Sequence, residues 1–460
     1  MNAWFPRITA HSLIVAISVL IYVLTTRVEH ERRPPSIAIA WVLGMFAVPY
    51  VALPMYLMFG RRKLPRKVLH WSGIRAHCTH WAQDLIESFG LPPCAPCTVR
   101  MHPDGKVSAA ALFDTMSGAA RRLDICTYIL GDDAFGREAM QRMIAQARAG
   151  VQVRFLIDGV GALQLPRSCL HVLNRAGVET EIFSPLLARK TQGPRNLRNH
   201  RKMVIADAAR LWAGGRNIAA EYFMGLDGAA PWRDLSFDLQ GKVAAAAAAQ
   251  FEADWIAAGG KPARREAAPA AAATATEDAA PDAGRAQFLP SGPDQAEDTV
   301  HALLIDACFQ SRERVLAVTP YFVPDAALET AMRLAARRGV KIDLVMPAVS
   351  NHRLADFARS RALRALKHAG VCIHLLPHMN HAKAVVFDES LALSGSVNLD
   401  SRSLLLNYEC AVVFYGAGEI DWLARWIEAL IPESQPFESR APGLLRDIAE
   451  GLLLTVAYQL

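Results

Sequence analysis

The strongest constraint on how this chain folds is one motif that occurs twice with the same spacing. Each copy contains a His, a Lys, an Asp, a Gly and an Asn, and every interval between them is identical in the two copies. The copies are His200, Lys202, Asp207, Gly214 and Asn217, and then His381, Lys383, Asp388, Gly395 and Asn398. Two copies in register indicate an internal duplication in which two similar units build one site.

The residues around each motif repeat as well. In each unit a short apolar run is followed by an amphipathic stretch and a second apolar run, which predicts a strand, a helix and a strand. The predicted elements are residues 125–130, 137–148 and 150–158, and then residues 315–321, 326–338 and 339–346. This order predicts an α/β fold with parallel or mixed sheets flanked by helices, in two copies related by a pseudo-twofold axis.

The spacing of the motif suits phosphodiester chemistry. Residues two apart on a strand project from the same face, so each His and its Lys point the same way. If both strands meet at the axis, one imidazole can attack phosphorus while the other donates a proton to the leaving alkoxide. Lys202 and Lys383 would hold the phosphate charge, and the glycines would let the backbone approach the phosphate. Asn217 and Asn398 would donate further hydrogen bonds, so no metal or cofactor is expected.

Asp207 and Asp388 complete the motif and are grouped with its catalytic residues, although a second role stays open. Five residues beyond the Lys on a strand, each Asp projects away from that Lys. A structural role in a turn or an interface is therefore at least as compatible with the spacing.

The first sixty residues predict a membrane anchor. Residues 8–26 and 34–60 contain no Asp, Glu, Lys or Arg, and about 20 apolar residues suffice for a helix to cross a hydrocarbon core. We expect two transmembrane helices, at about residues 8–26 and 36–59, in an anchor of residues 1–67. More basic residues follow the second span than lie in the short loop between the spans. The positive-inside rule therefore places the catalytic part in the cytoplasm.

An Ala- and Pro-rich stretch separates the two units. Residues 259–292 are dominated by Ala, Pro, Gly and Thr, a composition that buries too little apolar area to offset its ordering entropy. We expect a disordered linker there, between a first domain at residues 68–258 and a second at residues 293–460. Residues 244–258 are also compatible with an Ala-rich helix, and the apolar stripe of residues 444–456 suits either a membrane surface or the core.

The duplicated motifs resemble those of the phospholipase D superfamily, in which two α/β domains share one site. Both His-x-Lys motifs carry the resemblance, together with Gly214-Gly215-Arg216-Asn217 and Gly395-Ser396-Val397-Asn398. Within that superfamily the chain looks like the bacterial cardiolipin synthases. Asn199-His200-Arg201-Lys202, residues 319–324 and residues 395–403 carry this closer resemblance.

The resemblance implies a multi-pass phosphatidyltransferase of the bacterial inner (cell) membrane that converts two phosphatidylglycerols into cardiolipin and glycerol through a phosphohistidine. Phosphatidylglycerol and membrane lipid are its implied partners, without nucleic acid, and the sequence carries no signal for an oligomeric state. The resemblance also implies that His200 is the nucleophile and His381 the acid. A carboxylate downstream of each Asn would orient a histidine, Glu409 in the second copy and Asp234 in the first. Hydrolysis of a phospholipid, or less favourably of a nucleic acid, uses the same residues and is the alternative.

Overall fold

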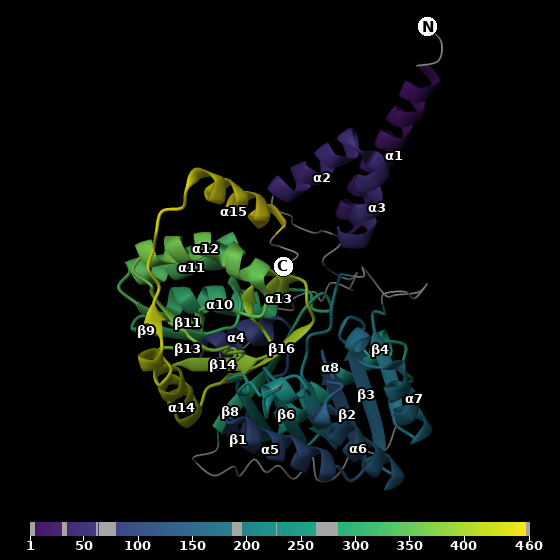
Figure 1. The fold of residues 1–460 in the computed structure, drawn as a ribbon, viewed down its shortest axis with the longest axis vertical. Helices are drawn as coiled ribbons and strands as arrows, with labels where there is room; N and C mark the ends of the chain where they lie inside the picture. The colour runs from purple at the N-terminus through teal and green to yellow at the C-terminus, as the bar shows by residue number, and fades with distance from the viewer. Residues whose placement is uncertain are drawn as a thin grey trace.

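The computed structural model has two halves of similar architecture, with three helices projecting from one end of the molecule (Figure 1). The structure describes residues 5–29, 35–60, 63, 80–185, 196–226, 228–263 and 284–456.

The two halves share a core succession of strands and helices. The first half contains α4 (Trp81–Ser88), β1 (Ala95–His102), α5 (Gly105–Ser117), β2 (Arg122–Thr127), α6 (Ala134–Arg148), β3 (Gln152–Asp158), η1 (Gly161–Gln164), α7 (Arg167–Arg175), β4 (Glu179–Phe183), β5 (Met203–Ala206), β6 (Arg210–Gly214), η2 (Ala220–Tyr222), β7 (Ser236–Gly241) and α8 (Lys242–Ala257). The second contains β8 (Gly284–Ser291), α10 (Thr299–Gln310), β9 (Arg314–Val318), β10 (Phe322–Val323), α11 (Ala326–Arg337), β11 (Lys341–Pro347), α12 (Arg353–His368), β12 (Cys372–Leu376), β13 (Ala384–Phe387), β14 (Leu391–Gly395), β15 (Leu399–Asp400), α13 (Ser401–Leu405), β16 (Glu409–Phe414), α14 (Ala417–Glu428), η3 (Ile431–Glu433), β17 (Gln435–Pro436) and α15 (Leu444–Val456). To the core succession the second half adds β10, β15, β17 and α15.

A 15-stranded sheet runs through both halves of the described chain. Its order is β17-β12-β11-β9-β13-β14-β16-β8-β1-β7-β6-β5-β2-β3-β4. Strands β1 and β8 pair antiparallel at the centre, and equivalent strands of the two halves follow in the same order on either side of them. In the first half β2, β3 and β4 pair in parallel, and β5, β6 and β7 continue the sheet antiparallel. The second half repeats this pattern with β9, β11 and β12 and then β13, β14 and β16. The predicted α/β fold with a mixed sheet and two repeats is confirmed.

The predicted strand, helix and strand units are found in both halves. In each unit the helix begins after an Asp that caps it and is followed by a glycine. Asp133 caps α6 by accepting from the Gly136 N–H, and Asp325 caps α11 by accepting from the Leu328 N–H. A glycine in the left-handed region follows each helix, Gly150 at φ +92° and Gly339 at φ +95°. Such caps satisfy backbone groups that the helix leaves unpaired, which fixes where the chain turns back into the sheet.

The boundaries of the expected linker differ from the structure. Residues 284–291 form β8, which pairs with β1 and β16 and buries Ala286 and Phe288, so the disorder expected up to residue 292 is wrong for this strand. Residues 264–283 lie outside the described residues. The Ala-rich stretch before them forms helix α8, whose Phe251 and Trp255 are buried in a core shared by strands of both halves. Helix α4, expected in the first domain, packs its Ala82 into the core of the second half.

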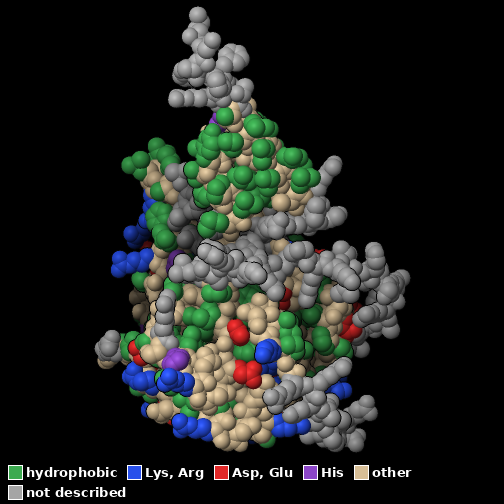
Figure 2. Space-filling view, turned by 90° about the vertical axis from the view of Figure 1, so that its right-hand side faces the viewer, with side chains coloured by type: hydrophobic (Ala, Val, Ile, Leu, Met, Phe, Trp, Pro, Cys, Tyr) green, Lys and Arg blue, Asp and Glu red, His purple; other side chains and the backbone are tan. Residues whose placement is uncertain are grey.

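The three projecting helices differ from the predicted membrane anchor. Among the described residues, no helix combines the length and the apolarity needed to cross a membrane, so the two transmembrane helices predicted at residues 8–26 and 36–59 are not found. The first range lies within α1 (Phe5–Glu29), and the second is divided into α2 (Pro35–Ala47) and α3 (Pro49–Phe59). The break falls at Val48, with φ −143°, because a proline disfavours helical backbone at the preceding residue. Apolar side chains cover the outside of these helices (Figure 2).

Candidate active site

Both motif histidines lie where the two halves of the molecule meet. The His200 N–H donates to the carbonyl of Tyr408 over 2.8 Å, and the His381 N–H donates to the carbonyl of Arg233 over 2.7 Å. Tyr408 and Arg233 each stand directly before an acidic residue. The backbone of each motif is therefore fixed beside a carboxylate that the other half supplies.

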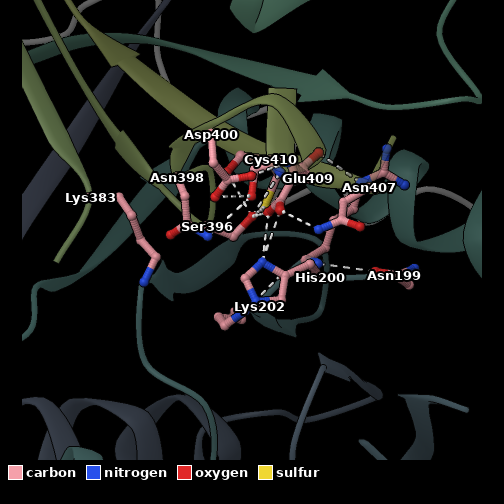
Figure 3. A network of polar contacts seen from close by, with 12 residues as sticks. Asn199, His200, Lys202, Lys383, Ser396, Asn398, Asp400, Asn407, Glu409 and Cys410 are labelled. Atoms are coloured by element: carbon pink, nitrogen blue, oxygen red, sulfur yellow. Dashed lines mark hydrogen bonds and ion pairs between the residues drawn. The ribbon is translucent and has the colours of Figure 1, made fainter. Parts of the chain in front are cut away.

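The histidine and carboxylate pairs cross between the halves. His200 Nδ1 lies 2.9 Å from Glu409 Oε1, a pair shown in Figure 3, and His381 Nδ1 lies 2.8 Å from Asp234 Oδ2. The predicted pairing of Glu409 with the histidine of the second motif and of Asp234 with that of the first is wrong. Order along the chain suggested a carboxylate from the same copy. The isolated β-bridges Asn199 to Tyr408 and Arg233 to Asn380 instead bring each histidine beside the carboxylate of the other half.

The crossed carboxylates fix the chemical form of both imidazoles. An ionised carboxylate only accepts hydrogen bonds, so Nδ1 of each ring carries the hydrogen and Nε2 keeps its lone pair. Burial lowers the pKa of His200 to about 4; Glu409 opposes this shift, while Lys202 and Lys383 add to it. Burial and then Lys383 lower the pKa of His381 to about 3. Both rings are therefore neutral near pH 7 and available as nucleophile or base.

Both motif lysines sit against the histidine of their own copy. Lys202 Nζ donates to the His200 carbonyl over 2.9 Å, and Lys383 Nζ lies 2.7 Å from His381 Nδ1 and 3.1 Å from Nε2. Burial lowers the pKa of Lys202 to about 8 and that of Lys383 to about 7. Each lysine also lowers the pKa of the histidine in the other half, so the two cations act on one shared site.

The glycines of the motif let neighbouring backbone approach closely. A Cβ on Gly214 would lie 2.4 Å from the Leu235 carbonyl oxygen, and a Cβ on Gly395 would lie 2.2 Å from that of Cys410. These glycines allow the chain directly after Asp234 and Glu409 to approach closely. An approach of the glycine backbone to a phosphate stays a prediction. The histidines and lysines also differ slightly from expectation, because they precede β5 and β13 instead of lying within them.

The two carboxylates are held in different ways. Ser396 Oγ donates to Glu409 Oε2, and Asn407 Nδ2 donates to Oε1 of the same carboxylate over 3.4 Å. The position equivalent to Ser396 is Gly215, where a Cβ would meet Asp234 Oδ1 at 2.2 Å. The two ends of the site are therefore not equivalent, although their histidines and lysines match.

Asn217 and Asn398 face partners within their own halves. Asn217 accepts from the Ile129 N–H over 3.3 Å and donates to the Tyr222 hydroxyl over 2.8 Å. Asn398 Nδ2 donates to Ser403 Oγ over 3.1 Å. The Asn398 side chain also forms a hydrogen bond with the Asp400 carboxylate. Because an amide has two N–H bonds, one donor of Asn217 is not used by its contacts. Binding of phosphate by these residues stays a prediction.

Asp207 and Asp388 lie in turns, as the structural role left open by their spacing requires, and their grouping with the catalytic residues stays a prediction. Both adopt the left-handed conformation, at φ 53° and 49°. The Asp207 carboxylate accepts from the backbone N–H groups of residues 120–122, and Asp388 accepts in the same way from residues 312–314. Each aspartate ties a turn to the start of the neighbouring strand, so its carboxylate is occupied in holding the sheet together.

Arg201, between the first His and Lys, has a structural role that the sequence did not predict. Arg201 is fully buried, forms ion pairs with Asp254 and Asp294, and donates from Nε to the Glu409 carbonyl over 2.9 Å. Alternation could have revealed it, since a charged residue between two site residues points into the core and requires buried acidic partners. Among the described residues, no cluster of three or more His, Cys, Asp or Glu side chains is arranged to hold a metal ion.

Comparison with known proteins agrees with this geometry. The family model described as "Cardiolipin synthase, PLD-like domain" matches residues 112–255 and 304–431, and one described as "Phospholipase_D-nuclease N-terminal" matches residues 14–61. Cardiolipin synthase A of Pseudomonas aeruginosa is 30% identical over 450 residues, which cover 92% of this chain and 90% of that protein. Cardiolipin synthase A of Pseudomonas fluorescens is 31% identical and covers 81% of each chain.

A solved structure shares the fold. Phosphatidylserine synthase of Haemophilus influenzae Rd KW20 superposes with a TM-score of 0.60 at 13% identity, covering 82% of this chain and 99% of that one. The two segments that match the synthase domain model contain the two motifs. On the strength of the family models and the relatives, this chain belongs to the phospholipase D-like cardiolipin synthase family.

Proposed function

We propose that the chain is a cardiolipin synthase, which transfers the phosphatidyl group of one phosphatidylglycerol to a second and releases glycerol. The crossed pairs His200–Glu409 and His381–Asp234 carry the proposal, because they set two neutral imidazoles in one buried site with two lysines. Similarity to cardiolipin synthase A over most of the chain supports cardiolipin as the product.

In the proposed first step His200 is the nucleophile. Its Nε2 lone pair forms the bond to phosphorus while the bond from phosphorus to the glycerol oxygen breaks. His381, protonated, gives its proton to that oxygen, so glycerol leaves neutral. Glu409 accepts from Nδ1 of His200 and stabilises the positive charge that develops on the ring.

The second step runs the same chemistry with a new alcohol. The free hydroxyl of a second phosphatidylglycerol gives its proton to His381, now a base, and attacks phosphorus. The bond between phosphorus and His200 breaks, which releases cardiolipin and restores both histidines. The charges of Lys202 and Lys383 act on the site throughout and offset the charge on the phosphoryl oxygens.

Substrate binding raises the pKa of His381, so that the ring can take from solvent the proton that it gives to glycerol. Its pKa of about 3 reflects burial and the charge of Lys383. A phosphodiester brings one negative charge next to the lysines, and an opposite charge nearby raises the pKa of an imidazole. Protonation of His381 is thus coupled to binding of the anionic lipid.

The alternative is hydrolysis, in which water takes the phosphatidyl group. The low exposure of the site favours transfer, since the His381 side chain is 4% exposed and that of Glu409 is 0% exposed, and exclusion of water protects a reactive intermediate. The test is to supply the purified chain with phosphatidylglycerol vesicles. Cardiolipin and glycerol in equal amounts are expected, whereas phosphatidic acid as the main product would refute the synthase proposal.

We also propose that the projecting helices hold the enzyme at a lipid surface. Leu13, Leu20, Leu43 and Phe46 are each more than half exposed, and such a contiguous apolar surface is typical of a membrane contact. Placement of the catalytic part on the cytoplasmic side stays a prediction, based on the basic residues that flank these helices.

A further inference from the structure

A second basic site lies outside the histidine centre, between helices α12 and α15. A solvent-open cavity of about 680 Å³ separates the two helices, and it shares no lining residue with the histidine site. Arg361, Arg364 and Lys367 line it from α12, together with His368. Ser439 and Asp447 line the opposite wall. With three basic residues against one acidic residue, the lining is net positive.

Helix α15 is held to α12 by its inner face. Glu450 is fully buried and forms ion pairs with Arg364 and with Arg446, and the Arg446 guanidinium lies 5.9 Å from the centre of the Phe357 ring. These contacts occupy Arg364. Arg361 is paired only loosely with Asp447, at 3.8 Å with both side chains about half exposed, a geometry in which solvent screens most of the attraction.

The outer face of α15 is apolar and exposed. Leu444 is 77% exposed, Leu445 is 83% exposed and Ile448 is 51% exposed. In Figure 1, α15 lies at the end of the molecule from which the apolar helices α1 to α3 project. A helix with an apolar outer face beside basic residues is typical of segments that lie in the surface of an anionic membrane.

We infer that the cavity between α12 and α15 binds the phosphate headgroup of an anionic membrane phospholipid while Leu444, Leu445 and Ile448 enter the lipid surface. Arg361 and Lys367 supply the charge for the phosphate, and Ser439 lies on the facing wall of the same cavity. The site orients the second half of the enzyme on the membrane. This inference extends the proposed membrane contact and is independent of the transfer chemistry.

Hydrogen exchange of the full chain on vesicles tests this site. Phosphatidylcholine vesicles are compared with vesicles that also contain phosphatidic acid, which has no headgroup alcohol and therefore cannot act as a phosphatidyl donor. We expect residues 361–368 and 439–451 to become protected only when phosphatidic acid is present. Free inorganic phosphate should not displace this protection, because the apolar contacts require the lipid.

Paired substitutions test whether the protection by phosphatidic acid arises from binding in the cavity. Arg361→Gln with Lys367→Gln should raise the phosphatidic acid content needed for half-maximal protection roughly 30-fold, which corresponds to about 2 kcal/mol for two basic residues at an anionic surface. The control pair Arg148→Gln with Lys242→Gln removes the same charge from exposed positions in the first half and should leave the protection unchanged.

Three results would overturn the inference: equal protection on pure phosphatidylcholine, equal loss in the control pair, or displacement by free phosphate. Leu445→Ser with Ile448→Ser, which alters exposed side chains that do not line the cavity, should also reduce protection and checks the apolar contact separately. Failure to form cardiolipin would refute the proposed function and leave this result untouched.

Discussion

At the scale of single residues, the chemistry depends on which carboxylate faces which histidine. The change Glu409→Gln keeps the shape of the side chain but removes the charge that stabilises a positive His200. We expect cardiolipin formation to fall roughly 10²- to 10⁴-fold. Asp234→Asn should have a similar effect through His381.

Nitrogen-15 NMR of the histidines tests the crossed pairing directly. Glu409→Gln should change the Nδ1 signal of His200 and leave that of His381 nearly unchanged, and Asp234→Asn should do the reverse. Signals that change in the histidine of the same half would contradict the crossed arrangement.

At saturating phosphatidylglycerol, where the bound lipid has raised the pKa of His381, the pH dependence of kcat should follow the lysines. Lys383, with a pKa of about 7, and Lys202, with a pKa of about 8, lose their charges as the pH rises, so activity should fall above about pH 7. His200 stays neutral down to about pH 4, so loss of the nucleophile should appear only near that pH. Lys383→Arg keeps its charge and should move the alkaline limb toward the pKa of Lys202. An alkaline limb that does not move in an active variant would exclude Lys383 as its cause.

The sequence could predict the composition of the site but not its pairing. The assignment of the His and Lys residues to one site needed only their identical spacing in two copies, because a duplicated pattern defines one geometry. The partner of each histidine depends on hydrogen bonds between residues about two hundred positions apart, such as His200 to Tyr408. Local spacing contains no signal for such a contact, so Glu409 and Asp234 were assigned to the wrong histidines.

At the scale of elements, the motif aspartates should govern stability and not catalysis. Asp388→Ala removes the acceptor for three backbone N–H groups and leaves a residue without a polar side chain in the left-handed region. We expect a loss of about 1–3 kcal/mol in the free energy of unfolding, measured by denaturant unfolding, with unchanged turnover per folded molecule. Asp388→Asn, which tolerates this conformation, should lose less. A variant of normal stability that has lost turnover would restore Asp388 to the catalytic residues.

Strands and helices were predictable where the apolar pattern was strong. The units at residues 125–158 and 315–346 have clear periodicity and capping residues, and both formed as expected. Average composition gave a wrong prediction for two segments. Strand β8 lies at the edge of an Ala-rich stretch, and Pro49 divides a long apolar run into α2 and α3. In both cases one local feature, a pairing partner or a proline, outweighed average composition.

At the scale of the whole molecule, Arg201 joins the halves behind the site. It pairs with Asp254 of α8 and with Asp294, which follows β8, so both acids depend on one guanidinium. Arg201→Met should destabilise the chain by about 3–5 kcal/mol, because it leaves the buried carboxylate of Asp254 and the largely buried one of Asp294 without their cationic partner. Adding Asp254→Asn and Asp294→Asn should recover part of that loss in denaturant unfolding. An unchanged unfolding midpoint in Arg201→Met would show that Arg201 does not hold the halves together.

The central claim is that two halves build one site in which both histidines are needed. The most direct measurement is cardiolipin and glycerol formation from phosphatidylglycerol by the chain and by its folded His200→Ala and His381→Ala variants. Each single variant should lose turnover as completely as the double variant, because nucleophile and proton donor act in the same step. Substantial cardiolipin formation by either single variant would contradict a shared two-histidine site.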